Sequence, residues 1–245
     1  MKNLLLAFSL VFLLAPDRFK QQQLQYERVR IAYAQKYTDL SKFLQAKKLD
    51  MNSLELYMRA FKHEQVLEIW AKKKEDAQYQ LLLTFPFCAM SGTLGPKRKE
   101  GDGQIPEGFY FIDRFNPKSN FYLSLGINYP NDTDKARNPT GKLGGDIFIH
   151  GDCQTIGCIT ITDDKMKVVY VLAVEAFEQG QTQIPVHFFP VRFTSPAYGQ
   201  LKETHAQSTK LLDFWQNLEG GYSYFEQNKR LPIVISLPSG AYQLQ

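Results

Sequence analysis

Cysteine is scarce in this chain of 245 residues, which contains only Cys88, Cys153 and Cys158. Small scaffolds built on disulfides carry many more cysteines, so the count excludes that class of fold. In an oxidising compartment an odd number leaves one thiol unpaired. The sequence leaves two pairings open. Cys88 with Cys153 keeps Cys158 free for chemistry, whereas Cys153 with Cys158 would disable it.

Strong net charge is also missing, because 29 Lys and Arg residues face 25 Asp and Glu residues for a formal charge of +4. The basic runs at 72–74 and 97–99 are short and lie beside turn residues, which is typical of solvated turns. We therefore expect no nucleic-acid partner. With 44% hydrophobic and 13% aromatic residues, the chain can build a sizeable core.

Long apolar runs are absent except at residues 4–15, where Ser9 is the one polar residue. This run follows Lys2 and is too short to cross a bilayer, as in the apolar region of a signal peptide. We expect residues 1–16 to be a signal peptide or N-terminal anchor of a protein exported to the periplasm or cell envelope. Membrane contact would arise only through this segment, if it is not cleaved. An N-terminal core helix is the alternative.

Apolar residues at steps of three and four predict an amphipathic helix over residues 22–44. A second short helix is expected from Asn52 or Ser53, either of which can cap it. Its buried face would hold Leu54, Tyr57, Met58 and Phe61. Residues 17–61 are thus predicted to be an N-terminal helical segment.

The following residues predict an α+β fold: a β-rich catalytic domain over 62–192 and a helical C-terminal extension with short terminal strands over 193–245. A charged turn at 72–76 joins two apolar runs as a hairpin. We expect a helix within 163–178 and a helical region over 195–218 that ends at Gly220-Gly221. The expected strands are 66–70, 79–85, 108–112, 122–125, 146–150, 158–161, 185–189, 231–237 and 242–244. Loops 91–107 and 128–145 are rich in glycine, proline, asparagine and aspartate, as binding loops often are.

A histidine and a cysteine lie at facing ends of two predicted strands: His150 ends one strand and Cys158 begins the next. A thiolate attacks acyl carbon, and a neighbouring imidazole can supply or stabilise it. Cys158 is therefore the candidate nucleophile and His150 its base. Gly157 permits a sharp turn, so the backbone N–H groups of Gly157 and Cys158 are candidates to bind an oxyanion, with Gly151 as backbone support.

Simpler explanations compete with this one. Cys158 could be an ordinary buried thiol, and His150 a structural residue at a strand end. His150, Cys153 and Cys158 could bind zinc, but the sequence offers no obvious fourth ligand and no CxxC pair. We therefore predict no metal and no organic cofactor.

Several motifs carry a resemblance to a known family. His150-Gly151 followed by Thr155-Ile156-Gly157-Cys158 resembles the signature of the L,D-transpeptidase (YkuD-type) catalytic domain, and the spacing HGDC-x-[ST]-x-GC is similar to its YafK-like branch. The resemblance extends roughly over residues 54–226. It includes the segments SGTLGPK at 91–97, EGDG at 100–103, PEGFY at 106–110 and LGINYP at 125–130.

The resemblance implies a β-rich, sandwich-like fold. It also implies an enzyme that acts on peptidoglycan stem peptides at meso-diaminopimelate through a thioacyl-enzyme. Loop residues in these motifs would orient the zwitterionic diaminopimelate centre or line the cleft, or else make salt bridges and turns. They are Lys97, Glu100, Asp102, Glu107, Asn128, Tyr129 and Thr155.

This sequence differs from the motif of the wider family in two features. The wider family usually has a histidine before the Gly-Cys pair, where this chain has Ile156, and the interval from His150 to Cys158 is shorter. Both features match the YafK-like branch, which implies an amidase that releases protein linked to peptidoglycan. An amine acceptor would give a crosslink and water would give hydrolysis. A non-catalytic peptidoglycan-binding module is the alternative of another class.

Overall fold

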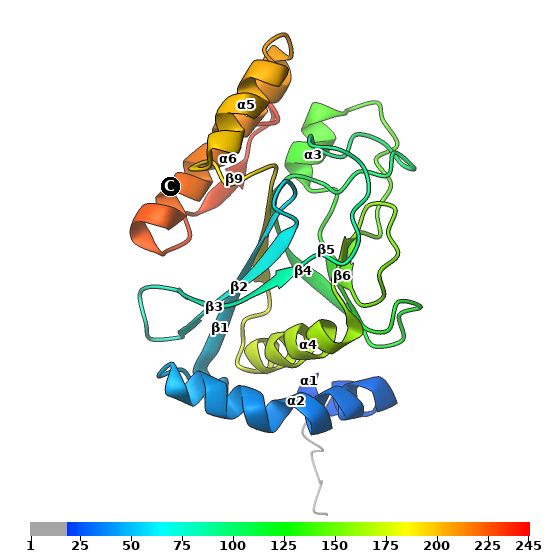
Figure 1. The fold of residues 1–245 in the computed structure, drawn as a ribbon, viewed down its shortest axis with the longest axis vertical. Coiled ribbons are helices and arrows are strands. Elements are labelled where there is room, and N and C mark those ends of the chain that lie inside the picture. The colour runs from blue at the N-terminus through cyan, green and yellow to red at the C-terminus, as the bar shows by residue number, and fades with distance from the viewer. Residues whose placement is uncertain (1–18) are drawn as a thin grey trace, which may run out of the picture.

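The computed structural model describes residues 19–245, and its main strands form one eight-stranded mixed sheet (Figure 1). These strands are β1 (Leu54–Phe61), β2 (Val66–Lys73), β3 (Gln80–Pro86), β4 (Gly108–Asn116), β5 (Ser124–Ile127), β6 (Phe148–His150), β7 (Ile159–Thr160) and β8 (Ile184–Phe189). Their order is β3-β2-β1-β8-β4-β5-β6-β7. The pairs β1/β8 and β6/β7 are parallel and the other neighbours are antiparallel.

The predicted second helix is wrong. After the short 3-10 helix η1 (Met51–Ser53) the chain enters β1, which lies between β2 and β8. All residues of β1 except Glu55 are buried, because both faces of this strand are covered. A continuous apolar run of this kind matches a helical pattern as well as a strand. The sheet therefore begins within the segment expected to be helical.

Three helices cover one face of the sheet: α1 (Phe19–Leu24), α2 (Glu27–Ala46) and α4 (Asp163–Glu178). In Figure 1, α4 lies between the sheet and α2, and α4 contacts β1, β5 and β8. The main hydrophobic core fills this interface, with fully buried residues such as Leu172 and Phe188. The helix predicted within 163–178 is confirmed at these bounds.

The C-terminal extension covers part of the opposite face (Figure 1). It consists of α5 (Pro196–Thr204), α6 (Thr209–Asn228) and the hairpin of β9 (Val234–Ser236) and β10 (Tyr242–Leu244). Trp215 and Leu218 of α6 pack on Phe61 and Phe189 of the sheet. The expected break at Gly220-Gly221 is wrong, because α6 continues to Asn228.

The α+β class, with N-terminal helices and a helical C-terminal extension, is confirmed. The proposed signal segment at residues 1–16 lies outside the described residues. Within residues 19–245, no helix has the length and apolar character needed to cross a membrane.

Candidate active site

His150 is fixed at the end of β6 by its neighbours in the sheet and by its own backbone. Its backbone pairs with Ser124 of β5, and its carbonyl accepts a hydrogen bond from the N–H of Ile161 at 3.0 Å. The side-chain Nδ1 lies 2.5 Å from the carbonyl oxygen of Gly151. A carbonyl only accepts, so Nδ1 carries the proton and Nε2 keeps its lone pair. The ring stacks on Phe121 at a centroid distance of 4.6 Å.

Cys158 immediately precedes β7, the strand that pairs with the strand of His150. The parallel register pairs Ile149 with Ile159 and His150 with Thr160, which places Cys158 beside Phe148. Continued one residue beyond β7, this register makes His150 and Cys158 diagonal neighbours along the backbone. Standard strand spacings put their Cα atoms roughly 8 Å apart.

Burial keeps both groups uncharged at rest. It raises the pKa of the Cys158 thiol, against smaller opposing effects of the Phe148 N–H and the Lys97 charge. Burial also lowers the pKa of His150. The thiol lies 3.8 Å from the carbonyl oxygen of Asp146, to which it can donate. The pair is therefore a neutral thiol and a neutral imidazole rather than a preformed ion pair.

The loop before Cys158 is organised by Thr155. Its Oγ1 accepts from the N–H of Gly157 at 3.1 Å and of Cys158 at 2.8 Å, and donates to the Cys158 carbonyl at 2.9 Å. Gly157 has φ +142°, and a Cβ there would lie 3.0 Å from the Gln104 carbonyl. Both N–H groups expected to bind an oxyanion therefore point at one oxygen in this conformation.

A disulfide connects this loop to the segment that follows β3. Cys88 and Cys153 are bonded with a Cα separation of 5.3 Å, and Cys158 is the free cysteine. Of the two pairings left open by the sequence, the structure has the one that spares Cys158. Only glycine fits at position 151 of this loop, because a Cβ there would clash with Asp163 Oδ1.

Lys97 and Asp102 form an ion pair of 2.6 Å near Cys158. Asp102 also accepts hydrogen bonds from the N–H groups of Arg98, Lys99 and Gln104. Burial alone would raise the pKa of Asp102, but these bonds and Lys97 lower it to about 2. Lys97 is buried, and its charge acts on the Cys158 thiol.

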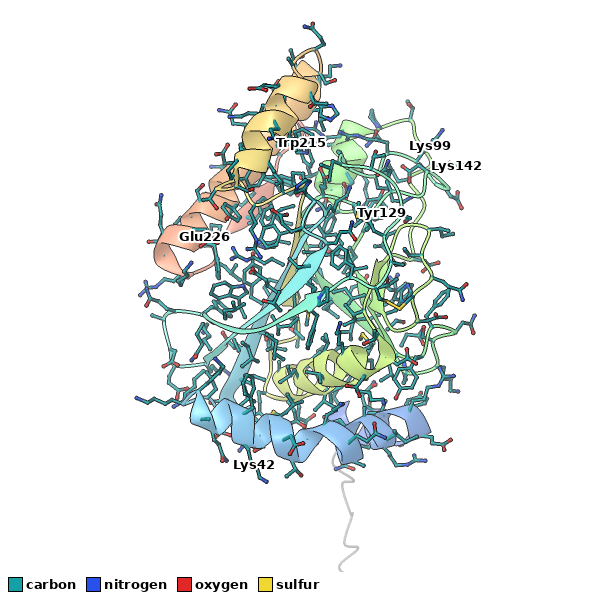
Figure 2. The ribbon with its side chains drawn as sticks, in the orientation of Figure 1. Lys42, Lys99, Tyr129, Lys142, Trp215 and Glu226 are labelled. Atoms are coloured by element: carbon teal, nitrogen blue, oxygen red, sulfur yellow. A yellow bond between two sulfur atoms is a disulfide. The ribbon has the colours of Figure 1, made fainter. Side chains whose placement is uncertain are left out.

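Glu107 lies elsewhere, in a buried cluster that the sequence did not reveal. Its Oε1 is 3.0 Å from Lys62 Nζ and accepts from the N–H of Gly95, and its Oε2 accepts from Trp215 Nε1 at 2.8 Å. Lys62 and Glu107 are both fully buried. This cluster joins the loop at 91–107 to α6, and Figure 2 labels Trp215 on that helix. A single lysine after an apolar strand gives no signal of such a role.

The remaining predicted residues anchor loops. Asn128 accepts from the N–H of Phe111 at 2.9 Å, and buried Tyr129 donates to the Leu143 carbonyl at 3.4 Å. The N–H of Glu100 donates to the Lys142 carbonyl at 2.8 Å, so the two long loops lie side by side, as Lys99 and Lys142 do in Figure 2.

The described part of the chain holds no group of three or more His, Cys, Asp or Glu side chains placed to bind a metal ion. The structure thus gathers His150, Gly151, Thr155, Gly157 and Cys158 at one place, with Lys97 and Asp102 beside them. Glu100, Glu107, Asn128 and Tyr129 have no hydrogen bond or ion pair to His150 or Cys158 in residues 19–245.

Comparison with known proteins identifies the family. The profile of the L,D-transpeptidase catalytic domain family (YkuD) matches residues 57–186. The chain is 36% identical over 189 residues to the Escherichia coli K12 protein named "Putative L,D-transpeptidase YafK", covering 76% of this chain and 72% of that protein.

Solved structures are more distant. The cell shape determining protein Pgp2 of Campylobacter jejuni has a TM-score of 0.44 at 19% identity, covering 75% of this chain and 73% of Pgp2. Bd1075 of Bdellovibrio bacteriovorus has a TM-score of 0.41 at 20% identity, covering 75% of this chain and 77% of Bd1075. On the profile match and the likeness to YafK, the chain belongs to the L,D-transpeptidase catalytic domain family.

Proposed function

We propose that this protein is a cysteine acyltransferase of the cell envelope that acts on peptidoglycan stem peptides at meso-diaminopimelate. The observation that carries the proposal is the relation of Cys158 to His150. The one free cysteine precedes the strand that pairs with the strand of His150, and Nδ1 of this histidine is bonded to the Gly151 carbonyl. This bond leaves Nε2 as the base.

The first step forms a thioester. Nε2 of His150 takes the thiol proton as Cys158 Sγ attacks the diaminopimelate carbonyl, and the amide C–N bond breaks. The leaving amine departs with the proton held by His150. In the second step an acceptor amine attacks the thioester, the C–S bond breaks, and a proton returns to Cys158. Because both groups are neutral at rest, His150 acts as a general base during attack.

The developing oxyanion would be bound by the backbone N–H groups of Gly157 and Cys158. They already converge on a single oxygen, that of Thr155. Thr155 must release them when the substrate oxygen arrives, so its hydroxyl holds the pair in position until then. Because both N–H groups already point at one oxygen atom, they support a preformed site that binds a single oxyanion.

Lys97 and Asp102 would contact the substrate beside the thiol. A diaminopimelate centre carries an amine and a carboxylate, which call for opposite charges in the site. The ion pair of these two residues offers both, and its cation already influences the thiol. The apolar residues 4–15 favour export to the periplasm, where this substrate is found.

Product analysis tests the function. The full-length chain is incubated with purified muropeptides and with muropeptides linked to a peptide, and products are identified by mass spectrometry. New crosslinked muropeptides, absent with Cys158→Ala, are expected. Released peptide without crosslinks would identify an amidase. Unchanged substrates, with Cys158→Ala and the native chain equally able to bind them, would indicate a non-catalytic binding module and contradict the proposal.

A further inference from the structure

A cluster of cationic side chains lies where the catalytic domain meets the C-terminal extension. Two hollows of about 550 Å³ and 530 Å³ adjoin there, and Arg98 and Lys210 line both. Arg137, from the end of α3 (Asp132–Arg137), lines the larger hollow. In Figure 1, α3 lies next to the end of the molecule formed by α5 and α6.

The two arginines approach the same aromatic ring, and the buried carboxyl of Asp134 interacts electrostatically with both without forming an ion pair. Their guanidinium carbons lie 5.9 Å (Arg98) and 4.4 Å (Arg137) from the centroid of the same ring, that of Phe214. Within residues 19–245, neither arginine has an ion pair within 4.0 Å. Asp213 lines the larger hollow but makes no such pair.

Arg137 is also incompletely satisfied. Its Nη1 and Nη2 donate to the carbonyls of Gly240 and Lys210, both at 3.2 Å. Its Nε is buried and has no hydrogen-bond partner in the described residues. Burial and the charge of Arg98 lower the pKa of Arg137, which indicates that the two guanidinium groups repel each other.

The wall of the smaller hollow adds further donors. It contains the first residues of α6, a helix of 20 residues whose N-cap Ser208 makes no side-chain capping bond. Free N–H groups at a helix N-terminus favour an anion. Paired guanidinium groups match the two oxygens of a carboxylate or phosphate.

We infer that Arg98, Arg137 and Lys210 form an oxyanion-binding site that holds a carboxylate of the peptide substrate whose carbonyl reacts at Cys158. The inference rests on the proposed function for the identity of the substrate. Arg98 directly follows Lys97 in the chain, so the Cα atoms of Arg98 and Lys97 lie about 3.8 Å apart. The charge of Lys97 in turn acts on the Cys158 thiol.

A chain of three or four residues spans about 10–14 Å, and the stem peptide carries several carboxylates along this length. A carboxylate of the same peptide within this span of the reacting carbonyl would then meet the arginines. A peptide fixed at both places would be presented to the thiol in one direction.

Binding to the catalytically inert Cys158→Ala chain tests the site. Isothermal titration calorimetry is carried out with a disaccharide-tetrapeptide muropeptide, its carboxyl-amidated form, and inorganic phosphate. We expect Arg98→Gln or Lys210→Gln to weaken binding of the muropeptide about tenfold, the effect of one charge-assisted hydrogen bond. The amidated form should bind as weakly to the unsubstituted chain. Lys42→Gln, an exposed cation on α2 labelled in Figure 2, is the matched control and should change nothing.

Three outcomes overturn the inference: equal binding of the native and amidated peptides, loss of binding in the Lys42→Gln control as well, or tighter binding of phosphate than of the muropeptide. Arg98→Lys should restore part of the affinity, because it keeps the charge but loses the fork. Acylation of Cys158 in the otherwise native chain is measured separately. Normal acylation with insensitive binding would reject this site alone, and sensitive binding without acylation would reject the proposed function alone.

Discussion

Thr155 uses its full hydrogen-bonding capacity to order the backbone around the nucleophile. Its hydroxyl accepts two N–H groups and donates to the carbonyl of Cys158. The conformation of residues 155–158 thus depends on one oxygen atom. This oxygen also marks the position to which a substrate oxyanion would bind.

Thr155→Val removes that acceptor and keeps the shape of the side chain. We expect acylation of Cys158 to slow roughly tenfold, because losing these hydrogen bonds costs on the order of 1 kcal/mol and loosens the nucleophile. Thr155→Ser keeps the hydroxyl and should stay close to the native rate. Single-turnover acylation followed by mass spectrometry measures both, and equal rates for Val and Ser would contradict this role.

His187 shows how burial makes a histidine structural. Its Nδ1 lies 2.9 Å from the hydroxyl of Tyr57, and burial, with a smaller effect of Arg59, lowers its pKa to about 3. The unfolded chain binds a proton at this histidine below about pH 6.5. The folded chain binds it only near pH 3, so this residue reduces stability as the pH falls between these values.

The comparison of the native chain with His187→Gln isolates this effect. Between pH 7.5 and 5 the free energy of unfolding of the native chain should fall by about 2 kcal/mol relative to the variant. Glutamine keeps an acceptor for Tyr57, and the titration of other groups cancels in the difference. Urea unfolding at each pH provides the free energies, and parallel curves for the two proteins would refute the assignment.

At the scale of elements, local patterns predicted the hairpin of β2 and β3 from its charged turn at 72–76 and the helix α4 from its apolar stripe, although β2 and α4 are both largely buried. They failed for β1, where burial on both faces removes the alternation of a strand. They also failed at Gly220-Gly221. There the glycines serve close packing on the sheet, which propensity alone does not reveal.

Gly221 lets α6 approach β4. A Cβ at this position would lie 2.5 Å from Cζ of Phe109, whereas at Gly199 of α5 nothing lies within 4 Å of it. Gly221→Ala should therefore lower the free energy of unfolding by about 1–3 kcal/mol through overpacking. Gly199→Ala should raise it by about 0.5–1 kcal/mol through helix propensity. Denaturant unfolding distinguishes them, and stabilisation by both alanines would show that α6 does not need this close contact.

The site was predictable to the extent that it is local. His150 and Cys158 flank a loop between predicted strands, so the sequence placed both at strand ends. The roles of Lys62 and Arg98 depend on how long loops and α6 come together, and no local pattern contains that information. For Glu107 the sequence left substrate contact or a salt bridge open, and the structure has a salt bridge to Lys62 and a hydrogen bond from Trp215.

At the scale of the molecule, a disulfide links the loop before Cys158 to a segment far away in the sequence. Cys88 and Cys153 are separated by 65 residues. The double variant Cys88→Ser with Cys153→Ser should lose roughly 4 kcal/mol of stability on the chain-entropy account. Cys158→Ser keeps the bond and should remain near the native value. Thermal unfolding with and without reductant compares them, and similar melting of all three would deny the bond a stabilising role.

The proposed mechanism depends on proton transfer from Cys158 to His150 and on formation of a thioester at the sulfur of Cys158. Intact-protein mass spectrometry, with peptide mapping after incubation with a tetrapeptide muropeptide, observes that species directly. We predict an acyl adduct on Cys158 in the native chain, none in Cys158→Ala, and formation at least about a hundredfold slower in His150→Gln. An adduct on another residue, or acylation of Cys158 at the native rate in His150→Gln, would contradict the account.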